Sequence, residues 1–491
     1  MTAPLDSDSP IRIAIIGGGL AGAALANALV RLPKLEVHVY ESAAEFSERG
    51  AAVGLSINAQ KALERVFSAS GTSATAATTA AKDILVRAGA VPMNSSRVLL
   101  GSGPQAGTMV ADMGGSDPGV TVHRASLLRE LLAPLPRGVL HAKRKLTVFH
   151  LSSPVGQQLQ LTFQDSVTEA FDAVVGADGI FSTVRDFLLK DWDNLKNPGS
   201  QTPKKYAAGP AGFWDCRVLV PYDKAKAIIG PELFEEDRQY AWMGDGAFIM
   251  HDILENRTMV QCIISAVETD EDLEENWHAI FEKTEKITDR KTPLTREFLN
   301  KALETWLDGP IAKRIIDVSI SSTSRQQSHP YSFVFSQPSP ARYRQYEHKQ
   351  TPSYTSLHSS RTLPIVLAGD AAHASTLFQG AGTGQAFEDA MILGTLFANL
   401  TSATQIPAAF RAYDALRRPR CQRVIDSSRE MGYLCCGQGE GGTVGLDPDA
   451  LRGAMAGKWD FIFGLDFEEY KKQAVGMMRE ELEKEGRKYL R

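Results

Sequence analysis

The sequence has little of what marks several common protein classes. Its five cysteines, in 491 residues, are too few for a disulfide framework, and none belongs to a CxxC pair of the kind found in zinc or redox sites. We therefore expect buried thiols and no bound metal. No apolar run approaches the about 20 residues that span a bilayer, and the acidic N-terminal segment is unlike a signal peptide. These absences predict a cytoplasmic protein that does not bind a membrane.

The chain also lacks an excess of charge of either sign. It carries 53 basic and 58 acidic residues, a net charge of −5, and no block of one sign dominates. A nucleic-acid-binding protein needs a basic surface, so we exclude nucleic acid as a partner. With 43% hydrophobic and 23% charged residues, the composition is that of an ordinary globular protein. At about 150 residues per domain, the length predicts two or three domains, and an enzyme fits this size best.

What is present begins with a pattern near the N-terminus. Ile11 to Ile16 is short, apolar and rich in isoleucine, which predicts a buried strand, and Ala23 to Leu32 has the composition of a helix. Between them lies the sequence GGGLAG, a GxGxxG turn, and a second predicted strand, Val37 to Tyr40, ends in Glu41. Strand, glycine turn, helix, strand and acid in this order predict a dinucleotide-binding unit.

Each position in this unit has a physical task. Gly17 permits the tight turn, Gly19 lets a pyrophosphate approach the backbone, and Gly22 lets the helix pack closely on the sheet. The helix N-terminus supplies amide donors to the diphosphate. Glu41 can accept hydrogen bonds from both ribose hydroxyls, and an acid there disfavours the 2′-phosphate of NADP. FAD and NAD both satisfy this pattern.

Two later segments separate FAD from NAD. The first is GADGIFSTVR, residues 176–185, which follows a predicted strand. The second is the strand PIVLAGDAAHA, residues 364–374, followed by a glycine-rich turn and a predicted helix in GAGTGQAFEDA, residues 380–390. An NAD dehydrogenase needs no second nucleotide-contacting turn so far along the chain. A flavin does, because its ribityl chain and ring system extend far from the adenine.

With these motifs in order, the sequence resembles the FAD-dependent aromatic monooxygenases, the class of para-hydroxybenzoate and salicylate hydroxylases. A further segment, His123 to Leu128, is similar to the family's HRxxL segment, and GQAFEDA is closest to the salicylate hydroxylase branch. The resemblance implies an α/β fold: a Rossmann-like FAD-binding domain with an inserted β-sheet substrate domain and a C-terminal helical segment. We expect the FAD-binding domain at 1–185 and 329–430, the substrate domain at 186–328 and the helical tail at 431–491.

The resemblance also implies cofactor contacts. Glu41 would bind the adenosine ribose, Gly54 would lie along the cofactor, and Arg124 would sit against the diphosphate and ribityl region. Asp178 and Arg185 belong to a motif linked to FAD and NAD(P)H. Asp370 would hold the ribityl chain. The backbone amides of the turn from Gly380 through Gly382 to Thr383 would face the N1/O2 edge of the flavin, where reduced flavin is an anion.

Three stretches are less typical. Leu377 stands where the family often has proline, which puts the shape of that loop in question. Ser336 to Thr362 is rich in Ser, Pro and Tyr, and Ser68 to Ala81 is nearly all Ala, Ser and Thr. We expect both of these to be solvated loops.

For the substrate pocket we expect a sheet between Arg185 and Ser328 that lays one face over the flavin. Its predicted strands include 213–220, 247–251 and 259–265, and surface helices are expected at 271–285 and 294–307. Arg217 could clamp a phenolate or carboxylate, and His251 could take the phenol proton as a base, although an exposed strand arginine and a structural histidine are the plain alternatives.

The resemblance implies that NADH or NADPH reduces FAD and that O2 then forms a flavin C4a-hydroperoxide, which hydroxylates a phenolic substrate. Hydroxylation with loss of a carboxylate, as with salicylate, and simple hydroxylation of a polyketide phenol in secondary metabolism both fit. Oxidative dearomatisation, or epoxidation of a polyketide or isoprenoid by the same chemistry, remains an alternative. We expect a monomer or homodimer.

Overall fold

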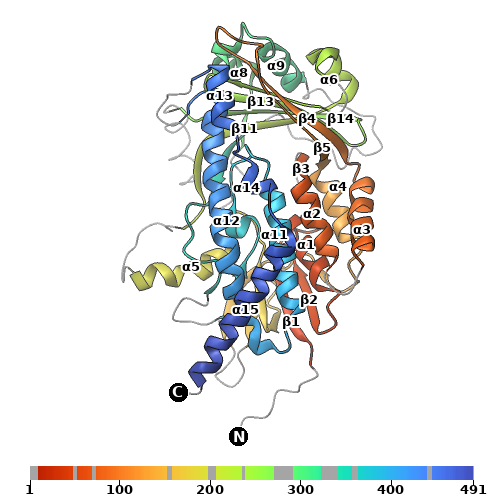
Figure 1. Ribbon diagram of the computed structural model, residues 1–491, viewed down its shortest axis with the longest axis vertical. Coiled ribbons are helices and arrows are strands. Elements are labelled where there is room, and N and C mark those ends of the chain that lie inside the picture. Colours follow the sequence, from red (N-terminus) through yellow and green to blue (C-terminus); the bar gives the residue numbers. More distant parts are fainter. Residues whose placement is uncertain are drawn as a thin grey trace.

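The structure is a computed structural model that describes residues 9–47, 52–68, 73–151, 158–196, 206–234, 238–269, 291–321, 341–356, 363–439 and 445–489. A parallel sheet with its helices forms one half of the molecule, and a large mixed sheet capped by short helices forms the other (Figure 1). The predicted helix at 271–285 lies outside the described residues.

The parallel sheet has five strands. Their order is β17 (Ile365–Leu367), β10 (Ala173–Gly176), β1 (Ile11–Ile16), β2 (Leu35–Tyr40) and β6 (Leu140–His141). Every neighbouring pair is parallel. β1 and β10 are apolar and buried along most of their length, as strands covered on both faces must be. The predicted unit of strand, turn, helix and strand at the N-terminus is therefore present.

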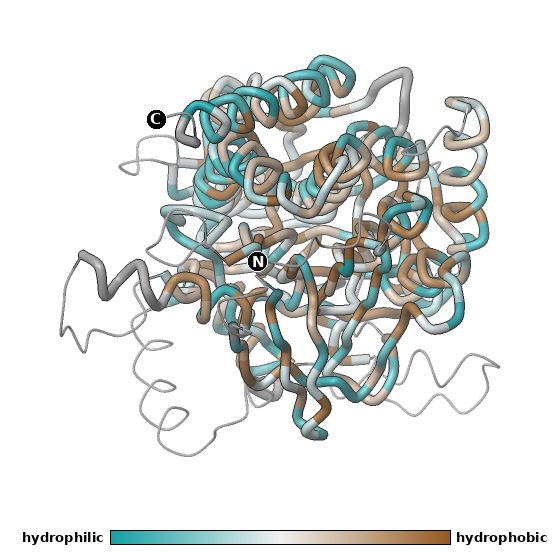
Figure 2. Tube along the Cα trace, turned by 90° about the horizontal axis from the view of Figure 1, so that it is seen from below, coloured by the Kyte–Doolittle hydropathy of each residue, from teal (hydrophilic) through white to brown (hydrophobic). Residues whose placement is uncertain are grey.

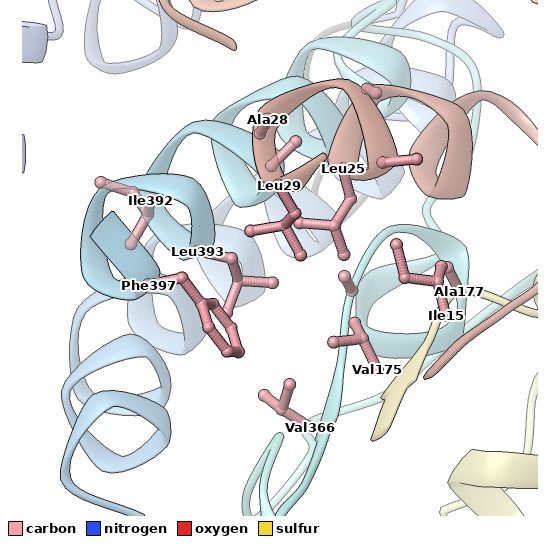
Figure 3. Close-up of a cluster of buried hydrophobic side chains, with 14 of the residues drawn as sticks. Ile15, Leu25, Ala28, Leu29, Val175, Ala177, Val366, Ile392, Leu393 and Phe397 are labelled. Carbon is pink, nitrogen blue, oxygen red and sulfur yellow. The ribbon is translucent and has the colours of Figure 1, made fainter. Parts of the chain in front are cut away.

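The core of this half lies between the sheet and two helices, α1 (Leu20–Leu29) and α11 (Gly382–Ala398). Figure 3 shows Leu25 and Leu29 of α1 pointing toward Leu393 and Phe397 of α11, above the sheet residue Val175. This half also contains α2 (Ile57–Phe67), α3 (Ala74–Arg87), α4 (Arg124–Leu132) and α5 (Thr183–Lys196). A small antiparallel sheet, β7 (Leu146–Leu151), β8 (Leu159–Phe163) and β9 (Thr168–Phe171), joins them.

The large sheet has nine strands. Their order is β15 (Lys291–Pro293), β16 (Ala341–Glu347), β11 (Gly209–Pro221), β14 (Met259–Val267), β13 (Ala247–Leu254), β12 (Gln239–Gly244), β4 (Val91–Leu100), β5 (Met109–His123) and β3 (Ala52–Leu55). β11 to β15 come from the predicted insertion, whereas β3, β4, β5 and β16 come from outside it. The sheet thus draws on more of the chain than 186–328, and the four-part division of the sequence stays a prediction.

The two faces of the large sheet bury different clusters. On the face that we call outer, Trp214, Trp242 and Ile249 pack with short helices (Figure 1), namely α6 (Tyr222–Ile229), η1 (Pro231–Leu233), α8 (Arg296–Ala302), η3 (Glu304–Trp306) and α9 (Ala312–Ser321). On the face that we call inner, Phe213 and Phe248 pack with Phe378 of the cofactor half. Because side chains alternate along a strand, parity decides which face each residue reaches.

The stretch from Ser68 to Ala81 is not a loop where it is described, and our prediction was wrong. Residues 74–87 form α3, capped by the Ser73 side chain, which accepts a hydrogen bond from the Ala76 N–H. Alanine has the highest helix propensity, and a stripe of side chains four and three residues apart becomes buried: Ala77, Ala81, Ile84 and Leu85.

The stretch from Ser336 to Thr362 also departs from prediction, because Ala341–Glu347 forms β16. This strand pairs antiparallel with β11, Asp215 lying opposite Tyr343. Its alternating tyrosines and arginines are typical of a strand near a sheet edge rather than of a solvated loop. The predicted surface helix at 294–307 is broken into α8 and η3, and Trp306 is fully buried.

The C-terminal part is helical, as predicted. The long helix α12 (Ile406–Cys435) packs on the parallel-sheet core at its start and on the inner face of the large sheet at its end (Figure 1). It follows the short α10 (Asp370–His373) and η5 (Ala403–Gln405) and precedes α13 (Pro448–Met455), α14 (Asp460–Phe463) and α15 (Phe467–Tyr489). Apolar segments gather inside and polar ones outside (Figure 2). Within the described parts of the chain, no helix is both long and apolar enough to span a bilayer.

Candidate active site

The ends of the parallel strands bring four predicted cofactor contacts to one edge. Gly17 follows β1, Glu41 follows β2, Asp178 closely follows β10, and Asp370 closely follows β17. Neighbouring parallel strands end at the same edge of their sheet, and that edge is where ligands bind in such folds. These residues are far apart in the sequence, and the order of the strands in the sheet brings them to the same edge.

The glycine turn is as tight as its sequence predicts. Gly17 has φ +110°, and a Cβ placed on it would lie 2.2 Å from the Ala177 carbonyl oxygen. A Cβ on Gly22 would lie 2.0 Å from the Gly17 carbonyl oxygen, so neither position admits a side chain. Gly19 precedes α1 as its N-cap and has no side chain to accept from the first amides of the helix. These amides are the donors that a diphosphate requires.

Glu41 is held in place by its neighbours. Its Oε2 accepts from the Gly18 N–H at 3.0 Å, and its Oε1 accepts from the Ala43 N–H at 2.8 Å and the Ser42 hydroxyl at 3.1 Å. A carboxylate offers about four acceptor sites, so one stays available to a ribose hydroxyl. The geometry fits a single ribose contact better than the two that the sequence predicts.

Asp178 is engaged by the start of α5. Its Oδ2 accepts from the N–H groups of Thr183 at 2.7 Å and Val184 at 3.2 Å, and its Oδ1 accepts from the Ser182 hydroxyl. Burial raises the pKa of Asp178, although these hydrogen bonds oppose the rise. The carboxylate thus caps a helix, and this arrangement favours a structural role over the direct cofactor contact that we expected.

Arg185 joins two motifs that lie far apart in sequence. Its Nη1 donates to the carbonyls of Ala371 and Ala372, each at 3.1 Å, and its Nη2 donates to the Thr351 hydroxyl at 2.7 Å. Its side chain is buried, and burial lowers its pKa to about 10, so it stays charged at neutral pH. The geometry therefore favours a structural role for Arg185, which hydrogen-bonds the backbone behind the turn of Asp370, over a contact with NAD(P)H.

A buried charged cluster that sequence reasoning missed lies behind the same turn. Asp389 accepts from the Gly369 N–H at 2.8 Å, from His373 Nε2 at 2.6 Å and from Arg417 Nε at 2.8 Å. Burial lowers the pKa of His373, but Cys421 and Asp389 outweigh that effect and raise it well above the usual value. By accepting from Gly369, Asp389 fixes the backbone at the start of α10. Asp370 is the first residue of that helix and is exposed.

His373, Asp389 and Cys421 also bring three ligand-type atoms within 4.8 Å of one another. Arg417 nevertheless donates to Asp389 at 2.8 Å and lies 3.3 Å from the Cys421 sulfur. A guanidinium in this position occupies the place of a cation and would repel a metal ion. The cluster is therefore an ion-pair network.

Three glycines frame open space where a flat cofactor would fit. A Cβ placed on Gly54 of β3, or on Gly380 or Gly382 at the start of α11, meets nothing within 4 Å. β3 contacts α11, so these glycines belong to neighbouring elements. Thr383, half-buried, continues the first turn of α11, and Arg124 begins α4 directly after β5. These positions on two adjoining elements therefore leave room for a cofactor beside the backbone.

Arg217 lies on the inner face of the large sheet, on the same side of β11 as Phe213 and Asp215. Its Nε donates to Asp215 Oδ2 at 2.5 Å, and its side chain is 33% exposed. Within the described residues its two Nη atoms have no polar partner, so they can bind a ligand. Ile263 lies opposite Arg217 on β14, and Met250 lies opposite Ile263 on β13.

His251 lies on the other face. It is fully buried, stacks on Tyr240 with ring centroids 5.6 Å apart, and its Nε2 bonds the Leu233 carbonyl at 2.9 Å. Burial lowers its pKa to about 4. Successive side chains of a strand point to opposite faces of the sheet. His251 therefore faces α6 and η1 instead of the cofactor half. The geometry does not support its predicted role as the base.

The comparisons agree with this geometry. Residues 338–428 match the model of the FAD binding domain family. The chain is 31% identical over 482 residues to a 6-methylsalicylate 1-monooxygenase of Aspergillus terreus, covering 97% of this chain and 94% of that protein. The chain belongs to the FAD-dependent monooxygenases of the salicylate hydroxylase type. It is an enzyme of this family, and FAD is its cofactor.

Other family members extend the match. A salicylate hydroxylase of Pseudomonas putida is 25% identical over 461 residues, covering 93% of each chain. The solved structure of a salicylate hydroxylase substrate complex superposes with a TM-score of 0.72 at 21% identity, covering 95% of this chain and 98% of that one. The likeness to the solved structure shows the fold alone. The family assignment therefore rests on the similarity to the 6-methylsalicylate 1-monooxygenase.

Proposed function

We propose that this monooxygenase hydroxylates a phenol that carries a carboxylate next to its hydroxyl group. One phenol, one O2, one NADH or NADPH and two protons would give a catechol-type diol, CO2, oxidised coenzyme and water. The observation that carries the proposal is the Arg217 guanidinium, which Asp215 orients on a largely apolar part of the inner face. The names of the two relatives, a 6-methylsalicylate monooxygenase and a salicylate hydroxylase, support it.

Bound FAD would supply the redox chemistry, because it can accept electrons from NAD(P)H and activate O2. The residues that fit it are the amides after Gly19, the carboxylates of Glu41 and Asp370, and the open backbone of Gly54 and Gly382. Their contribution is to bind and orient the cofactor, since the redox chemistry is its own.

Arg217 would bind the substrate. Its two Nη groups can donate in parallel to a carboxylate, the geometry that guanidinium groups favour. A positive charge beside the phenol oxygen also favours the phenolate, which makes the ring more nucleophilic. Met250 and Ile263 lie next to Arg217 across the sheet and would exclude water from the ring.

The neighbouring part of the inner face favours a compact substrate. Phe213 and Phe378 pack with ring centroids 4.9 Å apart, and Phe248 lies 5.9 Å from Phe378. Leu377 and Phe378 stand in the segment where related sequences often have proline. Side chains of this size fill space that a long isoprenoid would need, so ring hydroxylation is favoured over isoprenoid epoxidation.

A panel of matched compounds tests the proposal. Purified enzyme is given FAD, NADH or NADPH, and in turn salicylate, 6-methylsalicylate, phenol or benzoate. We expect coenzyme oxidation and diol formation to increase with the two salicylates and much less with phenol or benzoate. Equal stimulation by carboxylate-free phenols would contradict the carboxylate contact, and a dearomatised product would favour the alternative chemistry.

A further inference from the structure

We infer that a row of polar side chains on the inner face, two of them buried and two half-buried, positions the strand that carries Gly54, with Asp252 as the acceptor at its centre. The row consists of Ser96, Gln239, Asp252 and Gln261, one residue from each of four adjacent strands: β4, β12, β13 and β14. The inference rests on the proposed function, because it assigns these residues to the same cofactor site.

The hydrogen bonds in this row converge on one carboxyl group. Gln239 Nε2 donates to Asp252 Oδ1 at 2.5 Å, and Gln261 Nε2 lies 3.4 Å from Asp252 Oδ2. Behind them, the Ser96 hydroxyl donates to Gln239 Oε1 at 2.6 Å, and the Ala52 N–H donates to Gln261 Oε1 at 2.7 Å. Asp252 and Gln261 are also opposite each other in the strand register.

The orientation of Gln261 is forced. The backbone N–H of Ala52 can only donate, so the Gln261 oxygen must face it and the Gln261 amide nitrogen must face Asp252. Asp252 therefore has to present an acceptor on that side. Gln239 is less constrained, because its other partner, the Ser96 hydroxyl, can either donate or accept.

The far end of the row reaches the cofactor site. Ala52 is the first residue of β3, two positions before Gly54, and it pairs with His123, which precedes Arg124. β3 has four residues and lies at the edge of the sheet, where β5 is its strand partner. A short edge strand has few backbone contacts to fix it, so the hydrogen bond that the Ala52 N–H donates to Gln261 helps to hold its start.

The part of the row next to β3 is buried, whereas Ser96 and Gln239 are half-buried. Gln261 is 2% exposed and Asp252 is 4% exposed. Burial raises the pKa of Asp252 to about 6, and the bonds from Gln239 and Gln261 partly offset that rise. A buried N–H that loses its acceptor carries a full desolvation cost, so disrupting the row would displace or loosen β3.

Three variants test the inference. Gln261→Met keeps the volume and removes the acceptor of the Ala52 N–H; Asp252→Leu removes the central acceptor. Asp252→Asn keeps an acceptor for Gln261, provided that the Gln239 amide reverses. The control is Cys262→Ala, which removes packing on the outer face of the same strand. The measurements are the Kd for FAD, the visible absorption bands of bound flavin, and the melting temperature of the apoprotein.

We expect Gln261→Met and Asp252→Leu to raise the Kd for FAD about tenfold, as loss of one buried hydrogen bond implies, and to shift the flavin bands. Asp252→Asn should retain the wild-type Kd within about twofold, and Cys262→Ala should lower the melting temperature alone. Wild-type Kd and flavin bands in a folded Gln261→Met or Asp252→Leu protein would overturn the inference. A wild-type protein that binds no FAD would overturn the proposed function as well, which separates the two failures.

Discussion

The carboxylate of Asp215 accepts a hydrogen bond from Nε of Arg217 at 2.5 Å on the inner face of the large sheet. Asp215 is 6% exposed in its side chain and Arg217 33%, so the carboxylate is the fixed partner and the guanidinium reaches outward. Among the described residues, neither Nη group of Arg217 has a polar partner, so both can bind a ligand. This arrangement is the basis of the proposed contact with the substrate carboxylate.

Replacement of Arg217 tests that contact. Arg217→Gln would remove the proposed charge-assisted, two-point interaction with the substrate carboxylate, and we expect the KM for salicylate to rise about 30- to 100-fold, a loss of about 2–3 kcal/mol. The Kd for FAD should stay unchanged. Steady-state kinetics and flavin titration measure the two quantities, and an unchanged KM would remove Arg217 from the substrate site.

Asp215→Asn should have a smaller effect of the same kind. The amide keeps the volume and can still accept from Arg217 Nε through its oxygen, but the fixed charge is lost. We expect a KM between those of the wild type and Arg217→Gln. Because the two residues act through one contact, the double variant should be no worse than Arg217→Gln alone; additive losses would show that they act separately.

The open glycines allow a test of where FAD lies. A Cβ on Gly54 or Gly382 meets no atom within 4 Å, so Gly54→Ala and Gly382→Ala should leave the stability of the apoprotein unchanged or slightly higher. Each should nevertheless weaken FAD binding if the cofactor fills that space. Gly22→Ala is the contrasting case, because its Cβ would lie 2.0 Å from the Gly17 carbonyl oxygen and should disturb the apoprotein itself. Unchanged FAD affinity in Gly54→Ala and Gly382→Ala would place FAD elsewhere.

Arg185→Met should reduce both stability and FAD occupancy. The change leaves the buried carbonyls of Ala371 and Ala372 without their donor, at a cost of about 1–3 kcal/mol for each unsatisfied group. Chemical denaturation and flavin content measure the two effects. The control, Arg137→Met, alters an exposed arginine and should change the free energy of unfolding by less than about 0.5 kcal/mol. An Arg185→Met protein with wild-type stability and reduced coenzyme affinity would instead support a direct NAD(P)H contact.

His251→Phe should affect acid stability more than catalysis. The pKa of His251 is about 4 in the folded protein because of its burial, and about 6.5 when the chain is unfolded. The unfolded chain therefore binds the proton more readily, and stability is lost as pH falls from about 6.5 to about 4, by about 3 kcal/mol in total. Phenylalanine preserves the ring stack and removes this loss, although it also removes the bond to Leu233.

Denaturation of wild type and His251→Phe across this pH range measures the difference. The variant should show a shallower decline in the free energy of unfolding on acidification, and a kcat within about twofold of wild type, since the side chain faces away from the cofactor half. A large fall in kcat with unchanged KM and unchanged acid stability would restore His251 as a candidate base.

Local patterns predicted much of the fold. The turn from Gly17 to Gly22 and the strands on either side depend on residues within one short segment, so the sequence contains the whole signal. For α3 the composition led to a wrong prediction of a loop, because alanine and threonine are as typical of polar loops as of helices. The buried stripe through Ala77 and Ala81 is recognisable only once the elements that pack on it are known.

Residue roles that depend on non-local pairing could not be predicted. His251 and Arg217 both lie on predicted strands, but which face each occupies depends on the register of the sheet. Arg185 takes its carbonyl partner Ala371 from a segment far along the chain, and Asp389 takes its partners from the turn at Gly369 and His373 and from Arg417. The row of polar side chains through Asp252 requires four strands in one order, and no sequence motif marks it.

Isotope labelling follows both the oxygen atom and the carboxylate carbon through one turnover. The enzyme is supplied with FAD, NADH or NADPH, salicylate labelled in its carboxylate with 13C, and 18O2, and the products are analysed by mass spectrometry. We expect one 18O atom in each catechol formed and one labelled CO2 released for each catechol. Coenzyme consumption that yields hydrogen peroxide alone, with neither 18O in an aromatic product nor labelled CO2, would contradict it.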